Sequence, residues 1–149
     1  MRTVLTRLLS AKNYNTKYDD LALASLRIFI GLTMAFSHGL GKMPPPEGFV
    51  SHLQMMGLPA PDFLAWCAAL AELMGGLFLA AGLLTRPSAL FVTITMAVAA
   101  FGAHWADPFA KKEMALLYLF ASLFFVLHGA GRWSVDHWLS KYTRSERLQ

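Results

Sequence analysis

The chain consists mainly of four apolar runs, separated by short connections that contain proline, glycine and charged residues. The first run, Leu21 to Gly41, is long enough to cross a bilayer core as a helix at 1.5 Å per residue. The three later runs follow with short turns between them. We therefore expect an all-α integral membrane four-helix bundle with spans at residues 21–41, 60–84, 87–106 and 114–128.

Weaker apolar patterns outside these runs predict short helices at the membrane surface. Phe49, Leu53 and Met56 recur at helical spacing in the first loop, which indicates an interfacial or re-entrant helix. This segment could cover a pocket at its end of the bundle or serve only as packing. A final amphipathic helix is expected after Ser134, which can cap it, and a weak apolar face in residues 1–20 predicts a surface segment there.

The composition indicates that residues 1–149 form a single membrane domain. Hydrophobic residues make up 56% of the chain and charged residues only 15%, which excludes an ordinary soluble domain of this size. The net charge of +4 does not indicate nucleic acid, because the basic residues flank the apolar runs; lipid headgroups are the expected acidic partner. Cys67 is the only cysteine, which excludes an internal disulfide and a CxxC redox pair.

The distribution of basic residues predicts the orientation of the chain. Four spans would place both termini and the middle loop on one side of the membrane. That side would carry nine basic residues and the other side three; the nine are Arg2, Arg7, Lys12, Lys17, Arg86, Arg132, Lys141, Arg144 and Arg147, and the three are Lys42, Lys111 and Lys112. Because cytoplasmic loops carry the excess of lysine and arginine, both termini are expected in the cytoplasm.

The first span contains polar groups that are costly to place in lipid. Arg27, Gly31, Met34, His38 and Lys42 follow one another at steps of three or four, so an α-helix would align them on one stripe. A basic residue near the middle of a span is strongly unfavourable unless it meets a partner or water. The alternative is that Arg27 and Lys42 extend to opposite headgroup layers.

Small residues in the first two spans predict close helix packing. Gly31, Ala35 and Gly39 form a ladder at spacing four that would let another helix approach the backbone. Glu72 lies near the middle of the second span on a face of small residues, and a carboxylate there must be neutral or paired. Arg27 is expected at a similar depth. We predict an Arg27–Glu72 pair, which either pins two helices together or takes part in chemistry.

A second group of titratable side chains is expected in the outer half of the bundle. His38, Lys42, His104 and Glu113 should converge beneath the segment Phe49 to Met56. The alternative is a structural polar cluster satisfied by water and backbone groups. The candidate ligand-binding residues are therefore His38, Lys42, His104, Glu113, Arg27 and Glu72.

Taken in order, these residues resemble the motifs of the DoxX-like membrane proteins over most of the chain, from Leu21 to about Trp138. The matching pieces are Arg27-x3-Gly31, His38-Gly39-x-Gly41-Lys42, Gly57-Leu58-Pro59, Glu72-x2-Gly75-Gly76-x5-Gly82-x2-Thr85-Arg86, Glu113, and Gly129-x-Gly131-x2-Ser134-x-Asp136. The resemblance implies a four-helix bundle of the bacterial inner membrane. The family takes its name from small subunits of quinone-linked respiratory and sulfur-oxidising systems, and other members are linked to redox stress or to assembly of partner proteins.

Three functions of different kinds follow. The first is a quinone-handling subunit of an oxidoreductase: no haem, iron–sulfur or flavin signature is present, so a quinone or a partner protein must hold any electrons. The second is a non-catalytic membrane partner or assembly factor whose buried charges only specify the bundle. The third is a metal site on two histidines and one carboxylate, which lacks any local spacing signature, so we assign no metal ligands. No intrinsic cofactor is assigned either. A quinone is the candidate ligand, and a homo-oligomer is compatible with the sequence.

Overall fold

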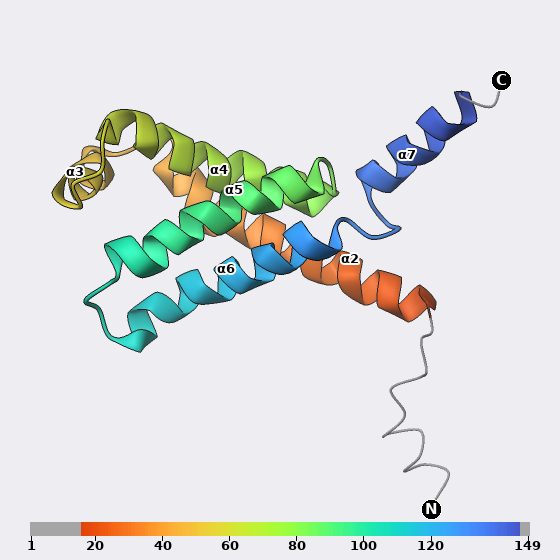
Figure 1. Ribbon diagram of the computed structural model, residues 1–149, viewed down its shortest axis with the longest axis horizontal. Helices are drawn as coiled ribbons and strands as arrows, with labels where there is room; N and C mark the ends of the chain where they lie inside the picture. The colour runs from red at the N-terminus through yellow and green to blue at the C-terminus, as the bar shows by residue number, and fades with distance from the viewer. Residues whose placement is uncertain (1–15, 147–149) are drawn as a thin grey trace, which may run out of the picture.

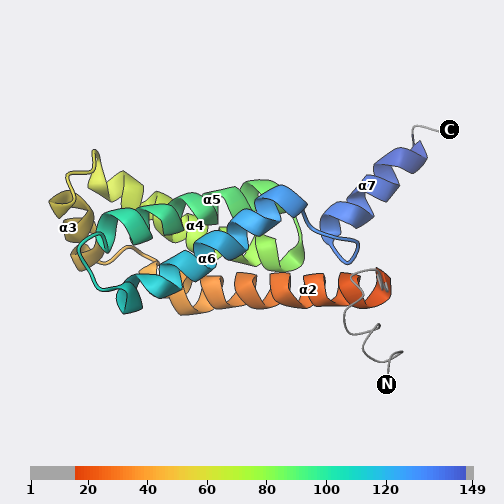
Figure 2. The same cartoon turned by 60° about the horizontal axis from the view of Figure 1, so that its bottom comes forward.

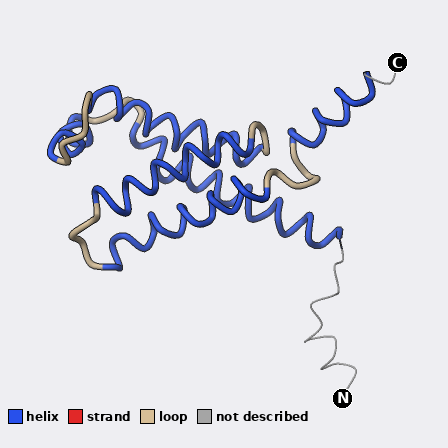
Figure 3. The backbone as a smooth tube through the Cα atoms, in the orientation of Figure 1, coloured by secondary structure: helices blue, strands red, loops and turns tan. Residues whose placement is uncertain are grey.

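The computed structural model describes residues 16–146, and these residues are largely helical, with no strand among them (Figures 1 and 3). The all-α prediction is therefore confirmed for this part of the chain. In chain order the helices are α2 (Thr16–Thr33), the π-helix η1 (Met34–Gly39), the 3-10 helix η2 (Leu40–Lys42), α3 (Glu47–Met55), α4 (Pro61–Ala81), α5 (Thr85–Val98), the π-helix η3 (Ala99–Ala103), α6 (Phe109–His128) and α7 (Val135–Glu146). The surface segment predicted within residues 1–20 lies mostly outside the described residues.

The long helices pack lengthwise, and the two short ones lie at opposite ends. α4 packs between α2 and α5, α5 packs against α6, and α6 also touches α2. The short helix α3 covers one end of this assembly, whereas α7 projects from the other end, near the start of α2 (Figures 1 and 2). The predicted helix in the first loop is present, and Ser134 caps α7 as expected, since its Oγ accepts a hydrogen bond from the His137 amide at 3.2 Å.

Three of the helical segments are long and apolar enough to cross a membrane: Lys17–Lys42, Pro61–Ala81 and Thr85–Ala103. Large apolar side chains on the outer faces of these segments are exposed, as with Phe29 (64%) and Phe91 (60%), and lipid is the environment that would cover them. The α6 helix has a spanning length of 20 residues, but charged side chains occupy its first turns. A fourth span therefore stays a prediction.

The α2–α4 interface is a seam of small residues, as the glycine ladder predicts. A Cβ atom on Gly31 would lie 2.5 Å from the Gly76 carbonyl oxygen, and one on Gly76 would lie 2.7 Å from the Gly31 carbonyl oxygen. Ala35 is fully buried between them, and Gly39 faces the backbone at Leu73. The two backbones can approach this closely only because these positions lack larger side chains.

The first membrane helix is not a uniform α-helix. Its register changes at the π-helix Met34–Gly39, where each turn contains more residues than in an α-helix, and the chain then tightens into a 3-10 turn at Leu40–Lys42. Residues before and after η1 therefore do not share one straight stripe. Side chains after Met34–Gly39, such as Lys42, therefore point in a direction that an unbroken α-helix would not give them.

Candidate functional site

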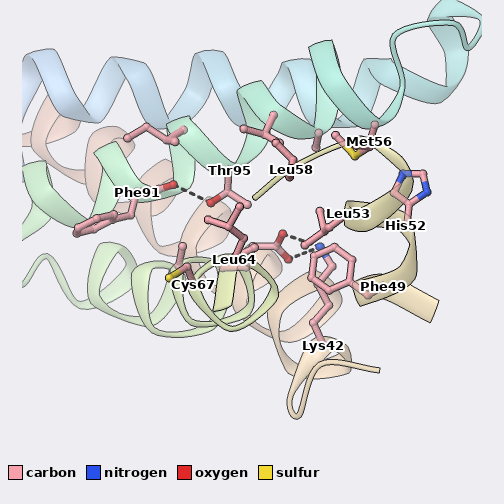
Figure 4. A pocket seen from close by; sticks show the side chains of 17 residues that line it. Lys42, Phe49, His52, Leu53, Met56, Leu58, Leu64, Cys67, Phe91 and Thr95 are labelled. Atoms are coloured by element: carbon pink, nitrogen blue, oxygen red, sulfur yellow. Dashed lines mark hydrogen bonds and ion pairs between the residues drawn. The ribbon is translucent and has the colours of Figure 1, made fainter. Parts of the chain in front are cut away.

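A cavity of about 380 Å³ lies beneath α3, between α4, the later part of α5 and η3 (Figure 4). Its walls are mainly apolar, with side chains that include Phe49, Leu53, Leu64, Phe91 and Ile94. The helix spacing that opens the cavity is set by small residues on α4 and η3, which also line it; these are Ala68, Ala71, Ala99 and Ala103. A cavity of this kind can hold a flat apolar molecule.

The strongest polar feature of the cavity wall is an ion pair between Lys42 and Glu72. The Lys42 ammonium donates to both carboxylate oxygens, with Nζ–Oε1 and Nζ–Oε2 distances of 2.5 and 2.7 Å (dashed lines at Lys42 in Figure 4). The Glu72 side chain is 1% exposed, whereas the Lys42 side chain is 30% exposed. The carboxylate is therefore held inside the protein, and its cation sits at the boundary between the interior and the cavity mouth.

Helix α3 covers this ion pair, which favours the interpretation of the first loop as a lid over packing alone. The Lys42 ammonium lies 5.1 Å from the centre of the Phe49 ring, a cation–π distance, and Leu53 on the next turn is buried. Proline residues 44–46 end the first membrane helix and turn the chain into α3. Only residues 43–46 therefore separate Lys42 from the start of the lid helix α3.

Three other polar side chains that the sequence analysis did not select also line the cavity. They are His52 on α3, Cys67 on α4 and Thr95 on α5. His52 could have been found, because it lies three residues after Phe49 on the apolar face that predicts α3. Cys67 and Thr95 carried no pattern of their own, and only the packing of α4 beside α5 brings them to the same cavity.

The expected convergence of His38, His104 and Glu113 beneath the lid is not found. None of the three lines the cavity. The His38 ring packs edge-on against Tyr118 of α6, with ring centres 5.1 Å apart. His104 instead shares a hydrogen bond of 2.8 Å with Asp107 in the following turn, and Glu113 is exposed on α6.

Arg27 is also placed differently from the prediction, since its guanidinium does not reach Glu72. Its Nη1 donates to the carbonyl oxygens of Leu79 and Ala80 at 2.8 and 2.7 Å, and its Nη2 donates to the carbonyl oxygen of Trp133 at 2.7 Å. Arg27 is 1% exposed, so it acts as a buried cap on the last turn of α4. The predicted Arg27–Glu72 pair is wrong.

The antiparallel register of α2 and α4 gives the reason. Glu72 lies next to Gly39, which is twelve residues after Arg27 and so about 18 Å further along a helix. The depth estimate assumed that the first apolar run begins level with the end of α4. In the structure the start of α2 extends past that level (Figure 2).

Arg27 belongs to a set of contacts at the α7 end that join distant motif residues. The Asp136 carboxylate accepts hydrogen bonds from the amides of Leu84 and Thr85 at 2.8 and 2.9 Å, and the Asp136 amide donates to the Gly82 carbonyl oxygen at 2.8 Å. These bonds satisfy the first amides of α5 and fix the first turn of α7 against the α4–α5 turn. The Arg27 and Asp136 contacts therefore stabilise the fold at this end, and the cavity lies at the other end.

The metal hypothesis has no support in the geometry of the described residues. Within residues 16–146, no three His, Cys, Asp or Glu side chains lie close enough together to hold a metal ion. What the cavity does offer is an ammonium donor and a carboxylate acceptor at an apolar wall. This pair can form hydrogen bonds with, and exchange protons with, a molecule that has polar oxygens on an apolar ring.

Comparison with known proteins agrees with this membrane architecture. The chain is similar to an "Uncharacterized protein" of Haemophilus influenzae (33% identity, covering 81% of this chain and 92% of the relative). It is also similar to "Putative oxidoreductase CatD" of Bacillus subtilis (31% identity, 78% and 85%) and to "Inner membrane protein YqjF" of Escherichia coli (28% identity, 84% and 97%). No solved structure matches the chain.

The family comparison covers the part of the chain that forms the cavity. The DoxX family profile matches residues 22–105, a stretch that runs from α2 through η3 and includes both partners of the Lys42–Glu72 ion pair. The match extends over more than half of the chain, and the Escherichia coli relative, matched over 97% of its length, is named an inner membrane protein. The chain therefore belongs to the DoxX family.

Proposed function

We propose that this DoxX protein is an inner-membrane quinone-binding component of an oxidoreductase, with four spans and both termini in the cytoplasm. The observation that carries the proposal is the ion pair of the buried Glu72 with the partly exposed Lys42 at the wall of an otherwise apolar cavity. A hydrophobic cavity with a few fixed polar groups is the usual form of a small-molecule site. The name of the Bacillus subtilis relative, which refers to an oxidoreductase, is in keeping with it.

The size and exposure of the cavity support a quinone ring. Its volume of about 380 Å³ lies at the lower end of the range of roughly 300–1,000 Å³ for ligand pockets. That is room for a substituted ring but not for a long isoprenoid chain. Phe91 and Ile94 line the cavity and are also exposed on the outside of α5, so a tail could leave past them into lipid.

The side chains present can do two things to a bound ring. The Lys42 ammonium can donate a hydrogen bond to a quinone carbonyl oxygen, and the Glu72 carboxylate can accept one from a hydroquinone hydroxyl. A bound quinone supplies a two-electron, two-proton redox couple. The single cysteine of the chain cannot form a dithiol couple on its own, so the electrons would come from a partner protein.

The proposal also includes α6 as the fourth span. At 20 residues it is about 30 Å long, which matches the hydrocarbon thickness. Its Lys111, Lys112 and Glu113 all lie near one end, where long charged side chains can extend into the headgroup layer. A four-span chain has both termini on the same side, and the excess of basic residues expected on that side favours the cytoplasm.

A titration on purified protein tests quinone binding with a matched pair of histidine variants. His52→Ala removes a side chain that lines the cavity, and His104→Ala removes one that does not. We expect saturable calorimetric binding of a short-chain ubiquinone or menaquinone analogue to the wild type. Glu72→Gln should lower the affinity about tenfold, because it removes a charged hydrogen-bond acceptor worth about 1.5 kcal/mol. His52→Ala should also weaken binding, and His104→Ala should leave it unchanged.

Two results would contradict the proposal. The first is a wild-type protein that binds no quinone analogue saturably. The second is an affinity that falls equally in the two histidine variants, because the cavity would then not be the site. If the first result were accompanied by a stoichiometric protein partner, the alternative function of a non-catalytic membrane partner or assembly factor would replace it.

A further inference from the structure

A second recess lies at the opposite end of the protein, between the start of α2 and α7, with a volume of about 620 Å³. We call it the basic cleft; its lining includes Lys17, Tyr18, Asp20, Arg132, Trp133 and Lys141. Three of these side chains are basic and one is acidic. Asp20 lies 3.7 Å from Arg132, so the balance of the lining is two positive charges. The cleft suits an anionic group.

The level of the cleft along α2 corresponds to the membrane surface. The segment Lys17–Lys42 has 26 residues and is therefore about 39 Å long, which exceeds the roughly 30 Å of the hydrocarbon core. If the apolar part from Leu21 onward fills that core, Lys17 and Tyr18 lie in the headgroup layer. The Arg132 guanidinium, 3.7 Å from Asp20, places the opposite wall of the cleft near the same level, and Arg27 holds that wall by donating to the Trp133 carbonyl oxygen at 2.7 Å.

The aromatic residues of the cleft fit this position. Tyr18 is 69% exposed and Trp133 is 59% exposed, and both residue types are enriched where a membrane protein passes through the interface. The apolar residues of α7 are exposed as well and recur at helical spacing; they are Val135, Trp138, Leu139 and Tyr142. With α7 projecting from the bundle (Figure 1), a membrane surface can cover this face while the basic cleft faces the headgroups.

We propose that the basic cleft binds the phosphate of an anionic phospholipid headgroup. Lys17 lies on α2, Lys141 on α7 and Arg132 in the loop between α6 and α7, so a phosphate in the cleft would meet donors from three segments. The lipid would tie α7 to the start of α2. Basic pockets at the ends of membrane helices attract anionic lipid through short-range charge interactions. This site is independent of the quinone cavity.

Binding of a fluorescent phosphatidylglycerol to the full chain in a neutral detergent, followed by anisotropy, tests the proposal. We expect saturable binding that unlabelled phosphatidylglycerol displaces and that phosphatidylcholine displaces at least tenfold less well. The double variant Lys17→Gln/Lys141→Gln should weaken binding about tenfold, since each cation near an anionic surface strengthens binding several-fold. The control Lys111→Gln/Lys112→Gln removes the same charge at the α3 end and should stay within twofold of the wild type.

Each other outcome would overturn the proposal. Equal losses in the two double variants would show non-specific attraction to a basic protein. Inorganic phosphate that competes as well as the lipid would make the ligand a soluble phosphate compound. Equal displacement by phosphatidylglycerol and phosphatidylcholine would show no selectivity for an anionic lipid. An acidic protein surface would then be the better candidate ligand of the cleft. As a folding control, Lys17→Gln/Lys141→Gln should give the same helical circular dichroism spectrum and unfolding midpoint as the wild type.

Discussion

Replacing Lys42 should destabilise the protein much more than replacing Glu72, although the two residues form one ion pair. Lys42→Met leaves a carboxylate that is 1% exposed without its cation, and removing one partner of a buried pair costs about 3 to 5 kcal/mol. Glu72→Gln leaves an ammonium that is 30% exposed and can turn to water, so the cost should be nearer to about 1 kcal/mol. The cost depends on which charge is left behind, and only one of them is fully enclosed.

The double variant Lys42→Met/Glu72→Gln should recover much of the loss seen in Lys42→Met, because no charge is then left alone inside the protein. Denaturation of the purified variants in mixed micelles, followed by circular dichroism, would measure the four free energies of unfolding. Lys111→Met is the matched control: its Nζ lies 3.6 Å from Asp107 in an exposed pair. We expect it to change stability by less than about 0.5 kcal/mol.

Equal effects of Lys42→Met and Glu72→Gln would show that Glu72 is not enclosed as the structure has it. Strict additivity in the double variant would show that the two residues do not interact. Either result would also remove the polar part of the proposed quinone site, since the same two groups are required there.

Three further outcomes are expected from other parts of the structure. A reporter enzyme fused after Gln149 should be active only if it is of the type that works in the cytoplasm. A reporter inserted near Glu47 should be active only if it is of the type that works in the periplasm, and the reverse activities would refute the predicted orientation. Gly31→Ala should destabilise the protein by about 2 kcal/mol in the same unfolding assay, because the added Cβ atom would meet the α4 backbone. Gly41→Ala is the control and should have little effect, because a Cβ atom there would meet nothing within 4 Å. Similar losses of stability in the two variants would exclude the close α2–α4 seam. The hydrogen bond with His104 lowers the pKa of Asp107, so this contact stabilises the loop at neutral pH and is lost as the pH falls through the lowered pKa. Asp107→Asn should therefore make the unfolding midpoint less sensitive to acid. A variant with the same pH profile as the wild type would count against the contact.

Much of the architecture could be predicted from the sequence because it depends on local spacing. The recurrence of Phe49, Leu53 and Met56 predicted α3, Ser134 predicted the start of α7, and the ladder of Gly31 and Gly39 predicted a tight helix interface. Each of these features is determined within a few residues. Predictions of such features therefore do not require knowledge of contacts between residues far apart in the sequence.

The candidate site was harder to predict because it depends on register between helices. Lys42 and Glu72 were both chosen as site residues, but Glu72 was assigned to Arg27. The pairing depends on how far α2 extends past the end of α4, which no local pattern reveals. His104 was expected to converge with the other titratable residues beneath α3, but the helix changes to a π-helix before it and the chain turns there toward Asp107.

The π-helix Met34–Gly39 makes this segment more tolerant of losing a residue than the regular α-helix before it. A π turn amounts to about one residue more than an α-helix needs for the same course, so deleting one residue, such as the exposed Ser37, would allow an ordinary α turn. Residues after the deletion would keep their course, so Lys42 would stay beside Glu72. One residue removed from the regular α-helix before it would instead rotate everything after it by about 100° and swing Lys42 away from Glu72. Among descendants of this sequence that keep the ion pair, single-residue gaps should thus fall within Met34–Gly39 and be rare within Thr16–Thr33.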